Sequence, residues 1–479
     1  MKRIYQQFEG RGRDSLMHRN LRMCTEEGVF ATPYVILTVP GNVFIAALMT
    51  TVLGIHESVY GWIVSLPSWA NALQVLLIPF FSRFYSSRFL TIAFSVINVA
   101  VWLALVATLH LLPLENPNTV GRLLLLYFAA ISLSQSLAGV SWLSWIQEWI
   151  PERIRGKYFG SRNRVMGLVT VAFILLTTWI FNRYGESMLA FQIILGVTGG
   201  LRLLSIYLLT HIYTPWSHPE KMIHEGWKAR YSDLMKPGPF RHYLLFAAVL
   251  AFCFSLTGPF YPVYMSQFLD FSVSRQTHLL ILASLASAVC MPIWGRLCDR
   301  YGCRPVIILT GTAWMAQNYL WVFLSEGINW LLYPMWVWGG TLSSGVVLGS
   351  FNLVLKLTPP QLKTTSVSLH LAVTSVAAAF APILSGWLLT TSLLPIDQVV
   401  TRYRLIFLLQ PTVVILSFLL LTRVKEPKAS GLSAFNGAFR TMRQILVQSG
   451  SLAAGNATFV RRISQSVLSA MDKKKTEGE

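Results

Sequence analysis

Long runs of apolar residues, separated by short polar segments, follow one another along most of the chain. A helix that crosses a bilayer needs about 20 mostly apolar residues, and these runs lack the period-two alternation of barrel strands. The pattern therefore predicts an all-α polytopic membrane protein. Twelve transmembrane helices are expected, at 28–53, 57–81, 88–113, 120–147, 164–183, 188–213, 241–264, 276–297, 304–325, 329–352, 364–390 and 403–424.

The composition excludes several other classes of protein. Of the 479 residues, 54% are hydrophobic and only 12% are charged, whereas a soluble domain carries about 25% charged residues. Too few charges remain to solvate a globule of this size, so a disordered chain, a disulfide scaffold and an ordinary cytosolic enzyme are excluded. The polar N-terminus is not followed by a short apolar core with a cleavage site, so we expect no secretory signal peptide.

The basic residues predict the orientation in the membrane. The net charge is +19, and with both termini on one side 33 of the 39 Lys and Arg residues lie on that side and five on the other. Cytoplasmic loops carry such an excess. We therefore expect both termini to be cytoplasmic in a plasma (inner) membrane. This distribution accounts for the positive charge without nucleic acid as a partner.

Cysteines and catalytic motifs give no sign of a metal, a cofactor or an enzyme. Two of the five cysteines fall within spans and three on the reducing side, so a structural disulfide is not expected. Neighbouring histidines that could complete a zinc site are missing from the sequence around them. The sequence also contains neither a phosphate-binding Gly-Lys-Ser/Thr loop nor a His-Glu-x-x-His motif.

An internal repeat divides the chain into two parts. Pro79 and Arg83 at the end of the second span correspond to Pro292 and Arg296 at the end of the eighth, at an offset of 213 residues. Prolines before the fifth and eleventh spans recur at an offset of 208. The repeat predicts two pseudo-symmetric six-helix bundles. The expected organisation is a cytoplasmic segment 1–27, bundles 28–213 and 241–424, a central cytoplasmic loop 214–240 and a basic cytoplasmic tail 425–479.

A loop motif between the eighth and ninth spans carries a family resemblance. The sequence Gly295-Arg-Leu-Cys-Asp299-Arg300-Tyr-Gly302-Cys-Arg304 resembles the loop signature of the Major Facilitator Superfamily. Cys303 replaces one basic residue of that signature, and the copy after the second span is degraded. By topology the resemblance covers residues 28–424. It implies a secondary transporter of twelve helices that acts as a monomer, and it does not identify a subfamily.

The motif suggests a gate at the cytoplasmic side. Gly302 permits a positive φ in the tight turn. By pseudo-symmetry, Asp299 should lie near the start of the fifth span, where Arg153, Arg155, Arg162 and Arg164 offer positive charge. We hypothesise that Asp299 pairs with these arginines across the two bundles and holds the inner gate closed. The alternative is that Asp299 only caps its own loop.

The resemblance also implies that spans one, four, seven and ten line a central path. Aromatic rings with scattered hydroxyls and amides suit an uncharged or amphipathic organic solute. The alternative for each residue is a hydrogen bond back to the helix, or packing at the membrane interface. The candidate residues are Asn42, Gln135, Ser136, Trp142, Ser255, Thr257, Tyr261, Trp336, Ser343 and Asn352, and prolines 33, 40, 259 and 262 mark bent or broken helices in spans one and seven.

Ionisable residues within the spans are few. No acidic residue is placed deep in a span, and Glu26 and Glu27 are expected at the inner mouth of the first. His370 is either a proton carrier or a neutral hydrogen-bonding residue. Arg202, in the sixth span, is expected to brace helices by donating to carbonyls, because that span lies outside the central path in the family. Binding of an anionic solute is its alternative role.

The C-terminal tail contains two segments with an amphipathic pattern. Segments 433–448 and 457–471 each place apolar residues on one helical face beside arginines, which indicates interfacial helices or, alternatively, an unstructured tail.

We expect a transporter that moves a small organic solute by alternating access in a lipid bilayer, with a coupling ion or as a uniporter. Alternatives are an efflux carrier for amphipathic or drug-like compounds and, in a different class, a lipid scramblase or membrane enzyme.

Overall fold

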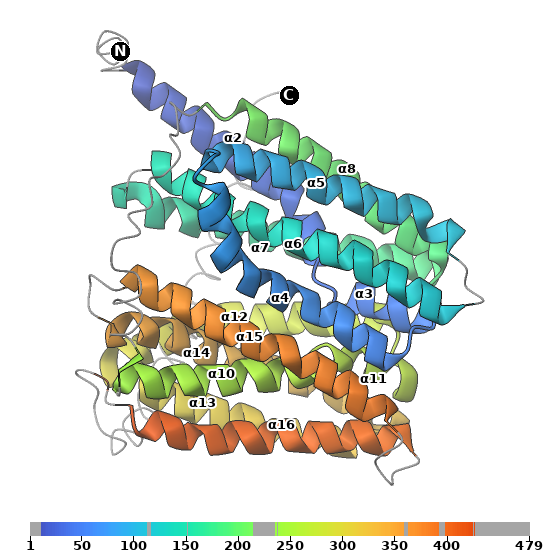
Figure 1. Cartoon of the computed structure of the whole chain (residues 1–479). Coiled ribbons are helices and arrows are strands. Elements are labelled where there is room, and N and C mark those ends of the chain that lie inside the picture. The colour runs from blue at the N-terminus through green and yellow to red at the C-terminus, as the bar shows by residue number, and fades with distance from the viewer. Residues whose placement is uncertain are drawn as a thin grey trace, which may run out of the picture.

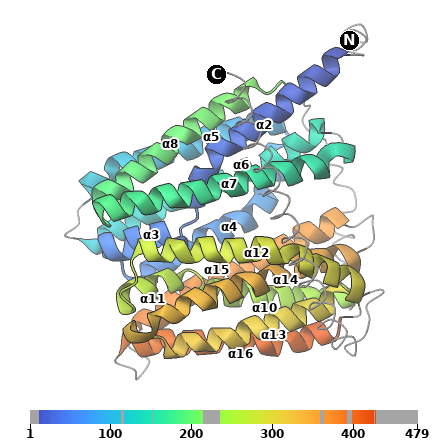
Figure 2. The same ribbon diagram turned by 180° about the vertical axis from the view of Figure 1, so that it is seen from behind.

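The chain folds into long, roughly parallel helices. The computed structural model describes residues 11–112, 116–150, 152–213, 235–236, 238–358, 363–391, 398–424 and 426. Within these residues every regular element is helical (Figures 1 and 2). Nine of the described helices are long and apolar enough to cross a membrane. The predicted all-helical polytopic membrane fold is confirmed.

The N-terminal half runs from α2 to α8, and its turns are short. Leaving the terminal segment and the loops aside, its elements are α2 (Arg11–Leu37), α3 (Val43–Ala47), the π-helical turn η1 (Leu48–Val52), α4 (Glu57–Phe81), α5 (Ser87–Thr108), η2 (Leu109–Leu111), α6 (Pro117–Trp149), α7 (Glu152–Tyr184) and α8 (Met188–His211).

The C-terminal half runs from α10 to α16 and repeats the order of the first. Its elements are α10 (Pro239–Thr257), α11 (Phe260–Phe268), α12 (Val273–Tyr301), α13 (Cys303–Asn318), the 3-10 turns η3 (Tyr319–Phe323) and η4 (Glu326–Leu331), α14 (Leu332–Leu357), α15 (Lys363–Thr390) and α16 (Val399–Thr422). Each of the twelve predicted apolar runs is helical over most of its length.

The first helix begins much earlier than its apolar run. The prediction started the span at residue 28, but α2 starts at Arg11 and continues without interruption to Leu37. Cys24 is fully buried with Trp145 and Ile146 of α6. Packing against this neighbour stabilises a helix whose first turns are too polar to be recognised as a span, because most helical stability comes from tertiary contacts.

Proline marks the breaks in two corresponding helices. Pro40 lies between α2 and α3, and Pro259 lies between α10 and α11. The fully buried Tyr60 joins the two breaks, since its hydroxyl donates to the carbonyl of Pro259 at 3.1 Å and to that of Pro40 at 3.4 Å. A proline break frees carbonyls that hydrocarbon cannot solvate, and the single hydroxyl hydrogen of Tyr60 is shared between a carbonyl of each half.

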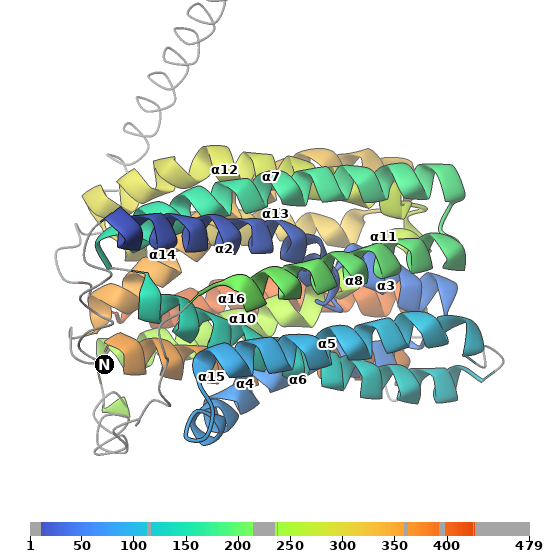
Figure 3. The ribbon, with the colours of Figure 1, turned by 90° about the horizontal axis from the view of Figure 1, so that it is seen from above.

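The two halves meet along two seams on opposite sides of the molecule (Figure 3). One seam is formed by α4 and α15 and the other by α7 and α12. We call the end where α2 begins and α16 ends the terminal end, and the end that holds α3 and α11 the far end (Figure 1). Thr178 and Thr277 share a hydrogen bond of 2.6 Å across the second seam, and Glu186 accepts one of 2.7 Å from the backbone N–H of Val273. Both lie at the far end.

Apolar packing follows the same division. One large buried cluster contains residues of both halves, among them Phe44 and Tyr60 with Phe260 and Tyr264. Toward the terminal end the clusters separate, one around Trp294 in the C-terminal half and one around Trp145 in the N-terminal half. The halves are thus joined by a common core at the far end and packed individually at the terminal end.

Two glycines let α4 and α15 approach each other closely. A Cβ added to Gly61 would lie 2.3 Å from the carbonyl oxygen of Pro382, and one added to Gly386 would lie 2.5 Å from that of Glu57. Real side chains never come so close to backbone. The seam therefore depends on the missing side chains.

We expect Gly61→Ala to lower the midpoint of thermal unfolding of the purified protein, because overpacking a tight contact costs about 1–3 kcal/mol. Gly196→Ala in α8 is the matched control. A Cβ there meets no described atom within 4 Å, so that variant should be neutral or gain up to about 1 kcal/mol of helix propensity. Equal midpoints for the two variants would contradict the close seam.

Candidate functional site

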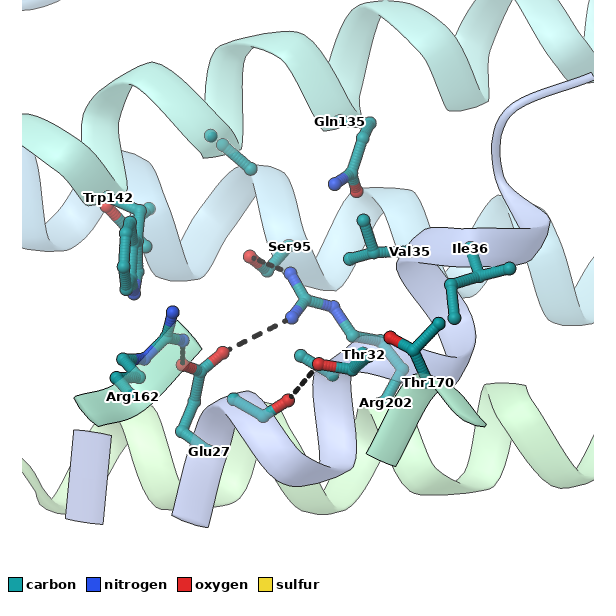
Figure 4. A pocket seen from close by; sticks show the side chains of 15 residues that line it. Glu27, Thr32, Val35, Ile36, Ser95, Gln135, Trp142, Arg162, Thr170 and Arg202 are labelled. Atoms are coloured by element: carbon teal, nitrogen blue, oxygen red, sulfur yellow. Dashed lines mark hydrogen bonds and ion pairs between the residues drawn. The ribbon is translucent and has the colours of Figure 1, made fainter. Parts of the chain in front are cut away.

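A cavity of about 400 Å³ lies within the N-terminal half (Figure 4). Its walls come from α2, α5, α6, α7 and α8. Three predicted residues line it, namely Gln135, Trp142 and Arg202. Apolar side chains such as Val35 and Ile36 complete the wall. Eight of its fifteen lining residues have polar or charged side chains, so the wall offers both hydrogen-bonding groups and apolar surface to a small molecule.

A carboxylate shared by two arginines holds the cavity together. Glu27 lies 3.3 Å from Arg162 and 3.6 Å from Arg202, through different carboxylate oxygens. The hydroxyl of Ser205 donates to Glu27 at 3.1 Å. Glu27 is 3% exposed and Arg202 is 6% exposed. Removed from water, these charges stabilise one another, because an isolated ion would be costly there.

Arg202 joins three helices through side chains. It donates to Ser95 on α5 at 3.0 Å and to Ser205 on its own helix at 3.1 Å, in addition to its ion pair with Glu27 on α2. Its guanidinium also lies 5.7 Å from the ring centre of Tyr34. Arg202 therefore contacts neighbouring helices, but its partners are a carboxylate and hydroxyls rather than the helix carbonyls that the prediction named. The same residue also lines the cavity.

Arg162 completes the wall from α7. Its guanidinium lies 4.8 Å from the ring centre of Trp142 on α6, and its Nε donates to the carbonyl of Cys24 at 3.3 Å. Arginine over an indole face is a favourable cation–π arrangement. The contact therefore joins α2, α6 and α7 at the edge of the cavity.

Glu27 is a site residue that the sequence analysis does not single out. The sequence predicts it at the inner mouth of the first span, and nothing in the sequence predicts its burial. The early start of α2 instead puts it on a buried face. Leu21 and Cys24, one turn apart and packed with Trp145, were the available signal that the helix extends toward the N-terminus.

Several other predicted cavity residues have structural partners elsewhere. Asn42 caps α3 by accepting from the N–H of Ile45 and donates to the carbonyls of Ile36 and Val39, so it stabilises the helix break. Ser136 bonds to Asn71 and Gln74 on α4. Among the C-terminal candidates, Tyr261 stacks on Phe407 and donates to Gln410, and Ser343 bonds back to Gly340. Thr257 is fully buried, and its hydroxyl has no partner within the described residues, while Ser255, Trp336 and Asn352 are half-buried.

The loop motif forms a tight turn at the terminal end. Gly302 has φ of +99°, which agrees with the prediction of a positive φ. The buried Glu426 accepts from the backbone N–H groups of Cys303 and Arg304 at 2.9 and 2.8 Å, and Lys356 lies 3.1 Å from it. A carboxylate thus caps the positive end of α13.

The rest of the motif is at the surface. Gly295 is half-buried within α12, while Asp299 and Arg300 are exposed near its end. The side chains of Arg153 and Arg155 lie outside the described residues, so their pairing with Asp299 stays a prediction. Arg162, which belongs to the same predicted cluster, forms its ion pair with Glu27. His370 is half-buried, stacks on Tyr243 at 5.7 Å between ring centres, and its Nδ1 has no partner in the described part of the chain.

Other expectations fall outside the described residues. They concern the segment 1–10, the central loop between 214 and 234, and the tail beyond 426 with its two amphipathic segments. Within the described residues, His, Cys, Asp and Glu side chains form no group that could hold a metal ion.

Comparisons with known proteins identify the fold. The profile of the Major Facilitator Superfamily matches residues 34–273 and 243–468. A D-xylose–proton symporter is 14% identical, with a TM-score of 0.66 over 86% of this chain and 98% of its own. An auto-inhibited peptide transporter of the POT family is 13% identical, with a TM-score of 0.65 over 86% of this chain and 99% of its own.

A bacterial homologue of the iron transporter ferroportin, solved in an inward-facing state, is also similar. It is 13% identical, with a TM-score of 0.63 over 85% of this chain and 98% of its own. No curated protein matches the sequence. Identities this low show a common fold and carry no information about the solute.

Two neighbouring acids provide a direct test of the buried ion network. Glu27→Gln should lower the midpoint of thermal unfolding, because removing one partner of a buried ion pair costs about 3–5 kcal/mol. Glu26→Gln is the control, since its partner Arg22 has a side chain that is 83% exposed and exposed pairs contribute at most about 1 kcal/mol. Equal loss in both variants would contradict the network.

Proposed function

Because this chain belongs to the Major Facilitator Superfamily, we propose that it moves a small organic solute across the membrane by rocking its two halves about a site that includes the N-terminal cavity. The family identifies an integral membrane protein and a secondary transporter rather than an enzyme. The solute, the direction of transport and the coupling ion are the subject of the proposal.

The division of contacts between the halves is the observation that carries this proposal. The far end has a common apolar core, the Tyr60 bridge and the Thr178–Thr277 bond, whereas the terminal end has separate cores. Such an arrangement fits a carrier closed at the far end, in which rigid halves exchange one set of contacts for another. In this scheme 28–213 and 241–424 are the moving units.

The proposed orientation places the terminal end in the cytoplasm. It is supported by the excess of Lys and Arg in the termini and loops that the sequence places on that side of the membrane. The far-end contacts then form an extracellular gate. At the cytoplasmic side, Asp299 and the arginines at 153 and 155 are candidates for the opposing gate, and the basic tail is a candidate interfacial anchor.

Solute contacts are proposed at Gln135, Trp142 and Arg202. His370 remains a candidate proton carrier in the C-terminal half.

An efflux carrier for amphipathic compounds is the alternative within the family, and lipid scrambling is the alternative outside it. Uptake into proteoliposomes from a panel of solutes, with and without a pH gradient, separates these functions. Uptake that ignores the pH gradient would contradict proton transfer through His370.

A disulfide that holds the far end closed tests alternating access without knowledge of the solute. Thr178→Cys and Thr277→Cys, in a chain whose five native cysteines are replaced, should form a disulfide because the two hydroxyls are 2.6 Å apart. Gly139→Cys adds a reporter to the cavity wall, where a Cβ meets no described atom within 4 Å. While the disulfide is formed, an impermeant maleimide should label the reporter from the terminal side of the membrane and not from the far side.

Reduction should restore labelling from both sides of the membrane. The variant with Thr178→Cys alone, which cannot form the lock, is the control. Labelling from both sides with the disulfide intact would overturn the proposed rocking motion. Uptake of any transported solute should stop and recover with the same treatment.

A further inference from the structure

We propose that the cavity selects an organic anion, which pairs with the arginine charge that Glu27 leaves unmatched. This inference rests on the proposed function, because it names the class of solute that the carrier would take. It adds a requirement that the carrier proposal does not contain, namely a preference based on charge.

The charges around the cavity do not cancel. Among its described lining residues, α7 contributes Arg162, α8 contributes Arg202 and α2 contributes Glu27, while the residues from α5 and α6 are neutral. Two cations therefore share one carboxylate. The geometry reflects this sharing, since each arginine contacts a different oxygen at 3.3 or 3.6 Å, which is longer than a good charge-assisted hydrogen bond.

The other groups that contact the two arginines do not carry a negative charge. Arg202 donates to two serine hydroxyls and faces the ring of Tyr34, and Arg162 faces the ring of Trp142. Hydroxyls and ring faces offer only partial charges. A net positive site within an apolar bundle is unfavourable until an anion enters.

Three polar atoms at the cavity lack partners within the described residues. They are Nε of Arg202, Nε1 of Trp142 and Oε1 of Gln135, all buried. The first two are donors that a carboxylate or phosphate oxygen would accept from, and the third accepts from a hydroxyl or amine of the same solute. Figure 4 shows the guanidinium of Arg202 between Glu27 and Gln135. An unsatisfied buried donor is costly, so an acceptor from a solute at Nε of Arg202 or Nε1 of Trp142 would stabilise the site.

The remaining wall favours an organic anion over an inorganic one. Ala31, Val35, Ile36 and Ala138 contribute apolar surface, and Trp142 contributes an aromatic face. A sulfate or phosphate ion would contact this surface without benefit. A cavity of about 400 Å³ accommodates a compound with an apolar body and one anionic group. A cationic solute would face two arginines, and a neutral one would leave the charge unmatched.

Thermal unfolding of the purified full-length protein tests the charge preference. Benzoate, benzamide and benzamidinium have nearly the same shape and differ in charge. Indole-3-acetate and phenyl phosphate extend the anionic set, and inorganic phosphate, phosphatidylglycerol and sodium chloride at equal ionic strength are the comparison arms. We expect at least one soluble organic anion to raise the midpoint in a concentration-dependent manner, and the neutral and cationic probes to have no effect.

Substitutions then connect the effect to the cavity. Arg202→Gln should weaken the apparent affinity for the stabilising anion by about tenfold or more, as expected for a lost hydrogen bond to a charged group. Arg202→Lys, which keeps the charge but loses Nε–H, should weaken it less. Trp142→Phe removes the indole N–H while keeping an aromatic ring, although the smaller ring also changes the face that Arg162 contacts. It keeps all three charges and therefore serves as a second variant if the arginine variants fail to fold.

Several results would overturn the proposal. These are stabilisation by benzamide or benzamidinium equal to that by benzoate, stabilisation by inorganic phosphate or phosphatidylglycerol alone, no stabilisation by any soluble anion, or an anion effect unchanged in Trp142→Phe and the Arg202 variants. The lock experiment uses no solute, so its failure would reject the rocking carrier separately from these results.

Discussion

A carboxylate buried with two arginines is the interaction on which the N-terminal half depends. Glu27 joins α2 to α7 through Arg162 and to α8 through Arg202, and Arg202 extends the connection to α5. In an apolar bundle, removal of Glu27 would leave both arginines without a carboxylate, whereas removal of either arginine would leave Glu27 paired with the other. The same network bounds the cavity. Structural stability and the proposed solute site therefore rest on the same three side chains.

A second constraint shapes the contact between the halves. Backbone carbonyls freed by proline require a donor inside the bundle. Tyr60 meets this requirement for both broken helices, and the close packing of Gly61 and Gly386 brings α4 and α15 together beside it. Hydrogen bonds and van der Waals contact of this kind can break and re-form as a unit. These contacts accompany the apolar core that the two halves share at the far end.

The candidate residues show why polarity alone did not identify the site. Asn42, Ser136 and Ser343 are polar residues in the expected spans, yet their hydrogen bonds are made within the protein. Gln135 and Trp142 have atoms without partners and line the cavity. A helix has several faces, and sequence specifies the residues on a face without specifying what the face meets. An unpartnered atom does not mark the cavity by itself, because Thr257 also has one and lies away from the cavity, so the tertiary structure has to place each face.

The sequence by itself determined the membrane class, the twelve helical runs and the turn at Gly302, because hydrophobic length and local backbone preference are encoded over a few neighbouring residues. It marked four prolines as bends or breaks, and the helices break at Pro40 and Pro259, whereas Pro33 lies inside α2 and Pro262 inside α11. The tertiary structure decided where α2 begins, since that depends on Trp145, more than a hundred residues away. It also decided that Glu27 is buried. An ion pair between residues 27 and 202 leaves no local signal, because each partner becomes tolerable in an apolar bundle only once the other lies beside it.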